Sequence, residues 1–385
     1  MDTEKFNGLA GTISISKLPN GEIVPTFTPK LLPIDVRPDQ ETIGLITKAA
    51  RELGFLSAFK DRKITKFLIY LYTIKEAVSS SRIEGTKSSV EEILLYEAKN
   101  SMESKTVANP DEQEVINYSR ALERGVELIK TRNIDTELIL ELHKLLMTGV
   151  RGKDKSPGEI RKTQNFIADN KMTRYAEASY IPPEPSRVPE LLENLFTYLN
   201  SDDGTNELIK ISIAHYQFEA IHPFRDGNGR IGRLLVLLYL IRKDILELPL
   251  LYLSGYFEKN RSEYYDMLLT ISQTGDYASW IKFFLHGIIS QSNDAVIRES
   301  KLVAYQNDYR KRIEEDGNMS VLKIFEELFI NPYISISNAA KVLTVTYPTA
   351  QRAINILVEM GILSEVTGFK TNRLYAAKGI IDIIS

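Results

Sequence analysis

Apolar residues recur at spacings of three and four between Glu41 and Ile297, and this repeat constrains the fold more than any other feature of the chain. Such spacing gathers the apolar side chains on one face of a helix. It predicts a mainly α fold. The expected helices are Glu41–Phe55, Ile64–Val78, Val90–Ala98, Glu112–Lys130, Asp135–Met147, Glu190–Leu199, Glu207–Ile221, Gly232–Arg242, Asn260–Thr270 and Tyr277–Ile297.

Two segments break the helical repeat. Residues 1–40 contain scattered prolines, which a long helix does not tolerate, and we expect an extended arm that packs on the next domain. Residues 158–188 are rich in Arg, Gln, Asn, Tyr and Pro and end in the sequence Ile-Pro-Pro-Glu-Pro. This composition is typical of a hairpin or flap followed by an extended turn.

The last part of the chain follows a different pattern, in which three helices precede two short strands. This order predicts a winged helix-turn-helix. Proline in the first turn of the third helix and Gly361 just after its end fit the usual asymmetry of helix termini. The expected elements are helices Val321–Phe329, Ser337–Leu343 and Pro348–Met360, and strands Ile362–Val366 and Arg373–Ala376 around a tip at residues 367–370.

A chain of 385 residues is too long for one compact core, because globular domains contain ~100–200 residues. We expect an N-terminal arm and helical region (1–115), a helical core (116–297), a linker helix (298–317) and the winged helix-turn-helix (318–385).

Composition excludes several classes of protein. The chain has no cysteine, which rules out disulfides, thiolate metal sites and a cysteine nucleophile, and suits a reducing cytoplasm. Its net charge of −3 gives no general attraction to nucleic acid or to an anionic membrane. The most apolar stretch, Leu234–Ile241, is far shorter than the ~20 residues that span a bilayer, and the N-terminus lacks a signal-peptide pattern. We therefore expect a cytoplasmic protein without a membrane segment.

The most informative stretch is a glycine-rich loop between two apolar helices, with the sequence His-Pro-Phe-Arg-Asp-Gly-Asn-Gly-Arg-Ile-Gly-Arg from His222 to Arg233. Gly227 and Gly229 permit positive φ angles, so that backbone N–H groups can converge on an anion. The following helix adds its N-terminal dipole and free donors. Arg230 and Arg233 are three residues apart and share a helix face, which favours phosphate binding.

Two further side chains complete this predicted site. Asp226 lies in the middle of the positive region, where a carboxylate is best explained by a divalent cation that bridges it to phosphates. His222 precedes the loop and is the expected general base. Taken singly, a histidine at a helix end is usually structural, and Asp-Gly-Asn-Gly is usually a turn. Their combination with two phased arginines favours a functional site.

The loop resembles the signature of the Fic family, H-x-F-x-(D/E)-G-N-G-R-x-x-R, and every specified position matches. The resemblance covers about residues 35–290. It implies a helical core preceded by a Fic-type helical region, with a β-hairpin flap, here Gln164–Ile181, over the nucleotide. It also implies adenylylation, in which AMP moves from ATP to a Ser, Thr or Tyr hydroxyl of a target protein or of the enzyme itself, and pyrophosphate is released.

The match implies a role for each residue of the motif. His222 would accept the proton of the attacking hydroxyl, and Asp226 would hold Mg²⁺ between the α- and β-phosphates. Arg230 would contact the β-phosphate and Arg233 the γ-phosphate, while Phe224 would anchor the loop. The remaining nucleotide-binding positions implied by the motif are Gly227, Asn228, Gly229, Ile231 and Gly232.

Two positions refine the implied chemistry. The family branch that transfers a terminal phosphate has a lysine in place of Gly229, so the glycine favours AMP transfer. The sequence Asn-Arg-Ser-Glu-Tyr-Tyr at residues 260–265 is similar to the family segment whose aromatic side chain lies beside the base, which points to Tyr265. A tyrosine pair on a helix is also common in core packing, and the sequence leaves that alternative open.

The sequence Ser-Ser-Arg-Ile-Glu-Gly at residues 80–85 places Ser80 and Glu84 on one helix face, and Gly85 can end that helix. Alone it predicts a helix C-terminus with a solvated glutamate. Beside the loop it resembles the inhibitory helix of the family, (S/T)-x-x-x-E-(G/N). The resemblance implies that Glu84 forms a bidentate pair with Arg233, occupies the γ-phosphate site and inhibits transfer within the chain. Relatives of this kind can also remove AMP, which the sequence leaves open.

Positive and negative side chains nearly balance in residues 318–385, which is a thin electrostatic footprint for DNA. We expect protein contact, homodimerisation or target recruitment there more than DNA binding. Two alternatives to an auto-inhibited adenylyltransferase remain: a nucleotide-sensing DNA-binding regulator, and a Fic enzyme that transfers another phosphate-linked group. The presence of His222 and Asp226 favours an enzyme, because a sensor needs no general base.

Overall fold

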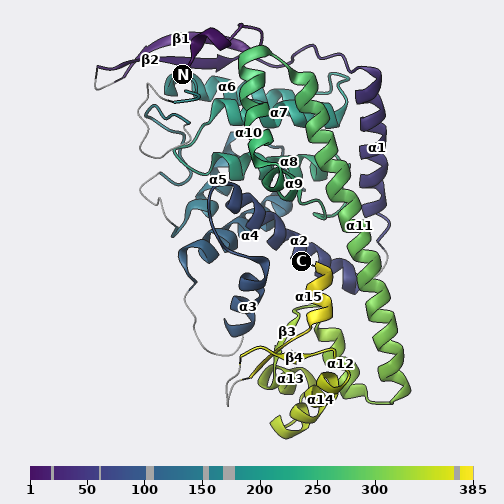
Figure 1. Ribbon diagram of the computed structural model, residues 1–385. Helices are drawn as coiled ribbons and strands as arrows, with labels where there is room; N and C mark the ends of the chain where they lie inside the picture. Colours follow the sequence, from purple (N-terminus) through teal and green to yellow (C-terminus); the bar gives the residue numbers. More distant parts are fainter. Residues whose placement is uncertain are drawn as a thin grey trace.

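The computed structural model describes residues 1–18, 21–59, 62–100, 108–150, 156–167, 178–367 and 373–384. Over these residues the chain is mainly α-helical, as predicted, with two small antiparallel sheets. Figure 1 shows the N-terminal hairpin at one end of a helical body and the C-terminal sheet at the other. Within the same ranges, no helix is both long and apolar enough to cross a bilayer.

The N-terminal arm is a β-hairpin rather than a single extended segment. After a short 3₁₀ turn (η1, residues 3–5), strands β1 (Gly11–Lys17) and β2 (Ile23–Pro29) pair antiparallel. The sequence Thr-Ile-Ser-Ile-Ser in β1 alternates polar and apolar residues, which is the period of a strand. The hairpin packs on the body through Phe27, whose N–H donates to Ile181 O at 2.8 Å and whose ring lies 5.8 Å from that of Tyr180.

The next helices correspond to the four predicted in this region: α1 (Gln40–Leu56), α2 (Arg62–Ile83), α3 (Val90–Asn100) and α4 (Pro110–Leu128). Side-chain caps explain two of their starts. Asp39 accepts from Thr42 N at 2.8 Å, and Asn109 and Glu112 form a reciprocal capping box. Helix α2 continues past its predicted end, so that it includes Ser80 and finishes directly before Glu84.

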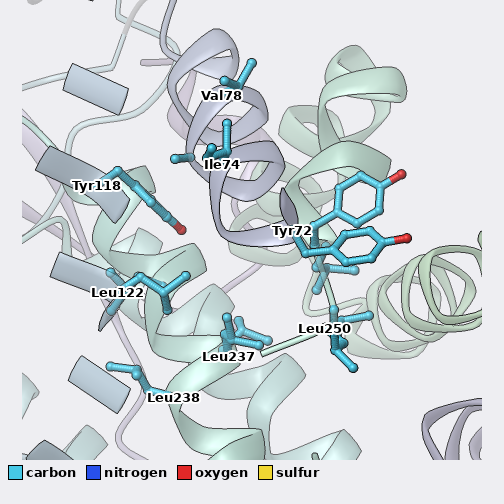
Figure 2. Packing of buried hydrophobic residues seen from close by; sticks show 14 of the residues in the cluster. Tyr72, Ile74, Val78, Tyr118, Leu122, Leu237, Leu238 and Leu250 are labelled. Carbon is cyan, nitrogen blue, oxygen red and sulfur yellow. The ribbon is translucent and has the colours of Figure 1, made fainter. Parts of the chain in front are cut away.

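The central elements are α5 (Thr136–Met147), η3 (Pro185–Arg187), α6 (Val188–Asn200), α7 (Glu207–Ile221), α8 (Asn228–Arg242), α9 (Leu253–Lys259), α10 (Arg261–Thr274) and α11 (Tyr277–Glu315). Helices α7 and α8 are buried on nearly all sides, which marks them as the centre of the body. Figure 2 shows part of the packing around α8: Leu238 of α8 lies near Leu122 of α4, and Tyr118 of α4 lies nearer to Ile74 of α2.

Helix α11 runs unbroken from Tyr277 to Glu315, so the predicted helix that ends at Ile297 and the predicted linker helix 298–317 are one element. It packs against α1 and connects the body to the C-terminal unit (Figure 1).

The C-terminal unit contains α12 (Met319–Glu327), β3 (Tyr333–Ser335), α13 (Ile336–Leu343), α14 (Tyr347–Glu359), β4 (Ser364–Glu365), β5 (Leu374–Ala376) and α15 (Lys378–Ile384). Its strands are antiparallel in the order β3-β5-β4. The helices and strands expected of a winged helix-turn-helix occur in the predicted order, together with β3 and α15, which the sequence did not indicate. Residues 368–372, which include most of the predicted tip, lie outside the described residues.

The predicted flap, Gln164–Ile181, is described only at its two ends. There Ile167 and Tyr180 form an antiparallel bridge, as at the base of a hairpin. Residues 168–177 lie outside the described residues.

Candidate functional site

The glycine-rich loop joins the end of α7 to the start of α8. Helix α8 begins at Asn228, four residues before its predicted start, because Gly227 (φ +79°) already turns the chain into the helix. Gly229 is therefore helical, and only Gly227 of the two glycines adopts the expected positive φ. The Asn228 side chain closes the loop: Oδ1 accepts from Phe224 N at 2.7 Å, and Nδ2 donates to Phe224 O at 2.8 Å.

The start of α8 is suited to an anion. Its first intrahelical hydrogen bond runs from Ile231 N to Gly227 O at 3.1 Å. The N–H groups of Asn228, Gly229 and Arg230 precede that bond and have no acceptor within the helix. Such a first turn attracts negative charge through its N–H groups and its dipole.

His222 lies at the end of α7 in the left-handed backbone region (φ +50°, ψ +61°). Its Nδ1 is 3.3 Å from Glu219 O, and because a carbonyl oxygen only accepts, we assign the proton to Nδ1 and the lone pair to Nε2. Burial, helped by the guanidinium of Arg161, lowers the pKa of His222 to about 4. Near pH 7 the residue is therefore a neutral imidazole with an unprotonated Nε2, the form that can accept a proton.

Arg233 is buried beneath the C-terminal end of α2. Its Nη2 lies 2.8 Å from Glu84 Oε1, and its Nε donates to Ser80 Oγ at 2.9 Å. The same Nη2 donates to Ser80 O at 2.9 Å. Glu84 and Arg233 are thus in contact, as predicted. The contact uses one carboxylate oxygen rather than the expected bidentate geometry, because Nε of Arg233 donates to Ser80 instead. The Arg233 side chain is 1% exposed and that of Glu84 is 34% exposed, so the carboxylate covers the guanidinium from the solvent side.

Gly229 makes room for this contact. A Cβ at this position would overlap Glu84 Oε1 and would lie 2.8 Å from Arg233 Nη1. The Glu84 carboxylate therefore rests against the first turn of α8, the turn whose N–H groups suit an anion. A residue larger than glycine would displace it.

Arg230 and Arg233 leave α8 toward different partners. Arg230 Nη1 lies 3.1 Å from Glu114 Oε2 on α4, and its Nη2 lies 3.2 Å from Asp226 Oδ1. Asp226 Oδ1 also accepts from Gly227 N at 2.7 Å. The Asp226 side chain is about one-third exposed, at the mouth of the loop.

The donor set fits Mg²⁺ that arrives with a nucleotide. Among the residues that the structure describes, no cluster of three or more His, Asp or Glu side chains could hold a metal ion alone. Mg²⁺ commonly binds through one or two carboxylates together with substrate phosphates. Asp226 could serve as such a carboxylate, because it is partly exposed and lies beside the turn whose N–H groups suit an anion.

Comparison with known families agrees with this geometry. The Fic/DOC family matches residues 133–240, and the Fic/DOC family N-terminal region matches residues 43–127. Together these matches cover half of the chain and include α2, α7, the loop and most of α8. The chain belongs to the Fic/DOC family. The resemblance inferred from the loop motif is thereby confirmed.

Curated relatives of this Fic/DOC chain are of modest identity. A probable protein adenylyltransferase of Aquifex aeolicus is 28% identical over 211 residues, which are 53% of this chain and 56% of that protein. A protein adenylyltransferase of Caenorhabditis elegans is 26% identical over 200 residues, which are 48% of this chain and 35% of that protein. The match thus spans little more than half of the first relative and about a third of the second.

Solved structures share the Fic fold. The crystal structure of a Fic family protein from Desulfovibrio desulfuricans has a TM-score of 0.57 at 21% identity and covers 90% of this chain and 98% of its own. A Fic domain containing signaling protein from Bacteroides thetaiotaomicron has a TM-score of 0.50 at 19% identity and covers 66% of this chain and 97% of its own. At these identities the likeness establishes the fold alone.

Buried polar residues absent from the sequence prediction support the Fic loop. His143 accepts from Gly158 N at 2.9 Å through Nδ1, so its Nε2 donates to Asp226 O at 3.0 Å. Its ring stacks on Phe224, with ring centroids 3.7 Å apart. Phe224, the expected anchor, is fully buried. Nearby, burial raises the pKa of Glu219 to about 8, so this carboxyl is mostly protonated at neutral pH.

The two tyrosines of the Fic core have different surroundings. Tyr264 is fully buried, and its hydroxyl donates to His215 Nε2 at 2.9 Å, while His215 Nδ1 donates to Gly232 O at 3.1 Å. The core-packing alternative therefore describes Tyr264. Tyr265 is 39% exposed, and its hydroxyl lies 3.5 Å from Ile83 O at the end of α2, at the edge of the site.

Proposed function

We propose that this Fic/DOC protein is an auto-inhibited protein adenylyltransferase, which transfers AMP from ATP to hydroxyl side chains of target proteins and of itself. The observation that carries the proposal is the position of His222: its Nδ1 faces Glu219 O, which leaves Nε2 to accept a proton, and one short loop joins it to the first turn of α8, whose N–H groups suit an anion. A proton acceptor and a phosphate site in this order are the parts that AMP transfer requires. Relatives named as protein adenylyltransferases support it.

In the proposed reaction, the hydroxyl oxygen of the target attacks the α-phosphorus of ATP, and the bond from that phosphorus to the bridging oxygen breaks. Pyrophosphate leaves, and the hydroxyl proton passes to Nε2 of His222. The N–H groups of residues 228–230 stabilise the negative charge of the phosphates. Mg²⁺, held by Asp226 together with the phosphates, would neutralise part of that charge when bound.

Auto-inhibition is proposed from the position of Glu84. Its carboxylate contacts Arg233 and rests on the turn that contains Gly229, so it occupies the place that a terminal phosphate would need. ATP must compete with Glu84 for Arg233. While Glu84 holds the arginine, the α-phosphate would lie out of line with the attacking hydroxyl.

The test is label transfer from ATP with Glu84→Gly. This variant should become labelled by α-labelled ATP faster than wild type, and it should not become labelled by γ-labelled ATP. His222→Ala in the Glu84→Gly background should abolish labelling, whereas His286→Ala, which changes an exposed histidine of α11, should retain it. Labelling by the γ-phosphate alone would identify a phosphate transferase. Equal labelling with and without His222 would overturn the assignment of the base.

Nucleotide competition distinguishes AMP transfer from the alternative, an enzyme that transfers another phosphate-linked group. If AMP is the group transferred, unlabelled ATP should suppress labelling while UTP and GTP at the same concentration should not. Mass spectrometry of the labelled Glu84→Gly variant would then identify the modified hydroxyl. A mass increase other than that of AMP would contradict the proposed reaction.

A further inference from the structure

Arg161 is an arginine without an assigned role that lies against the turn at His222. It follows α5 and precedes the predicted flap, and it is 2% exposed. A guanidinium that has left water must replace its lost hydration with hydrogen bonds. Its partners therefore show which part of the molecule depends on it.

Those partners include backbone carbonyls at the end of α7. Arg161 Nε donates to His222 O at 2.8 Å, and Nη2 lies 3.4 Å from Ile221 O. The backbone N–H of Arg161 donates to Pro223 O at 2.9 Å. One residue thus binds three successive carbonyls, from Ile221, the last residue of α7, to Pro223 in the loop. The last carbonyls of a helix have no intrahelical partner.

The same guanidinium connects this turn to the segments on either side of the predicted flap. Nη2 donates to Pro183 O at 2.5 Å, and Nη1 lies 3.5 Å from Thr163 O. His222 needs such support because its left-handed backbone conformation is uncommon for a residue with a Cβ atom. Without fixed carbonyl partners, the turn could relax and rotate the imidazole away from the loop.

We propose that Arg161 is a positioning residue for His222, which fixes the left-handed turn so that the imidazole can accept the proton of the attacking hydroxyl. This inference rests on the proposed adenylyltransferase function. Arg161 also acts through its charge. Burial and Arg161 lower the pKa of His222, whereas the carbonyl of Glu219 and the carboxylates of Glu84 and Asp226 raise it. Removal of the arginine should therefore raise this pKa toward the usual value of about 6.5.

The experiment compares Arg161→Met and Arg161→Lys in the Glu84→Gly background. With Met, AMP transfer at pH 7 should fall on the order of 10–100-fold with little change in the KM for ATP, because the base is misplaced. The acid limb of kcat/KM should move to higher pH. Lys keeps the charge but not the planar fork, so it should restore the pH profile more than the rate. Arg187→Met, which changes an exposed arginine, is the matched control.

NMR titration of the histidine rings gives a readout that does not require activity. His222→Ala identifies the His222 signal among four histidines. In Arg161→Met this signal should titrate at higher pH than in wild type. An unchanged titration, with AMP transfer reduced only as far as the melting temperature falls, would overturn the proposal. Absence of AMP transfer from Glu84→Gly itself would instead refute the proposed function, and the titration would still decide the role of Arg161.

A separate observation connects the C-terminal unit to α2. Lys75 of α2 is buried, and its Nζ donates to Ile384 O at 2.6 Å, while Arg298 of α11 donates to Ile383 O at 2.6 Å. Two cations thus bind the carbonyls at the end of α15, the end of a helix that favours positive charge. Figure 1 shows α15 beside α11 and next to α2.

Lys75 is adjacent to a second tether of α2. The buried carboxylate of Glu76 accepts from Tyr118 OH at 3.0 Å and from Ser254 N at 3.0 Å, so α4 and α9 hold the same turn. Ser80, which binds Arg233, lies one turn further along this face of α2. The middle of α2 is therefore fixed on one side by the body and on the other by α15.

We infer that α15 clamps α2 in the position from which Glu84 reaches Arg233, so that displacement of the C-terminal unit relieves the inhibition. Lys75→Met should increase amide hydrogen exchange in residues 72–84 and raise auto-adenylylation. In the Glu84→Gly background it should cause no further rise, because the carboxylate that the clamp positions is absent. Arg298→Met, which leaves α2 intact, should act in the same direction. Lys66→Met, an exposed position on α2, is the control.

Two results would overturn the role of α15 as this clamp. Wild-type exchange and wild-type AMP transfer in Lys75→Met would overturn the clamp. An equal rise in both backgrounds would also overturn it, because the effect would then not pass through Glu84. If Glu84→Gly shows no transfer, the proposed function fails, and the exchange measurement alone tests whether α15 restrains α2.

Discussion

Replacing Glu84 by glutamine should release the proposed inhibition only in part. An exposed ion pair contributes about 0–1 kcal/mol, and breaking a buried one costs about 3–5 kcal/mol. The pair of Glu84 and Arg233 lies between these cases, because the arginine is buried and the carboxylate is one-third exposed. We take about 2 kcal/mol for the whole contact. Glutamine keeps an oxygen that can accept from Arg233 but loses the charge, so it should forfeit about half of this energy.

These energies predict a graded series of AMP transfer rates. Because 1.4 kcal/mol corresponds to a factor of about ten, Glu84→Gly should exceed wild type by about 30-fold and Glu84→Gln by about fivefold. Initial rates of incorporation from α-labelled ATP, at equal protein and Mg²⁺ concentrations, measure the series. A glutamine variant as fast as the glycine variant would show that the charge is not what competes with the phosphate. Wild-type rates in both variants would refute the competition altogether.

Three further predictions concern stability and metal dependence. Burial lowers the pKa of His215 to about 3, so its contribution to stability is present above pH 6.5 and is lost as the pH falls toward 3. Urea unfolding of His215→Gln should therefore show a difference in unfolding free energy between pH 7 and pH 5 that is smaller than in wild type by about 2 kcal/mol. Gly125→Ala should destabilise the fold by about 1–3 kcal/mol, because its Cβ would lie 2.8 Å from Leu238 Cδ1. Gly44→Ala, in open space on α1, should instead stabilise the fold by about 0.5–1 kcal/mol. Thermal unfolding that ranks the two variants the other way would contradict this packing. Asp226→Asn should raise the Mg²⁺ concentration needed for half-maximal AMP transfer, and an unchanged Mg²⁺ titration would exclude Asp226 as the ligand.

The helices were predictable where an apolar repeat met a clear boundary. Helix α7 has the predicted bounds Glu207–Ile221, because Asn206 caps its start and a turn ends it at His222. The start of α8 was wrong by four residues, because two glycines around an asparagine are typical of a loop. The bonds between Asn228 and Phe224 close that loop early, and only Gly227 is needed for the turn.

The second half of α11 was predicted as a separate linker helix although its apolar repeat continues. Beyond Ile297 its exposed surface is highly charged, but Leu302, Tyr305, Tyr309 and Ile313 keep the helical spacing and pack on the core. Ion pairs one turn apart add to its stability, between Arg310 and Glu314 and between Arg312 and Asp308. Because its charged surface has the composition of a solvated linker, the prediction divided one helix into two.

The candidate site was predictable to the extent that it lies in one short motif. The residues of the loop are consecutive, so their chemistry could be inferred from spacing. The contact between Glu84 and Arg233 joins positions 149 residues apart and was inferred only from a family resemblance. Neither residue spacing nor a family motif pointed to Arg161. Its identified acceptors are backbone carbonyls, such as that of His222, and every residue has a carbonyl, so no side-chain motif marks the residues it supports. A buried arginine of this kind becomes visible only when the folded backbone brings those carbonyls together. Residues that position the base are for that reason the part of this site that a sequence motif cannot supply.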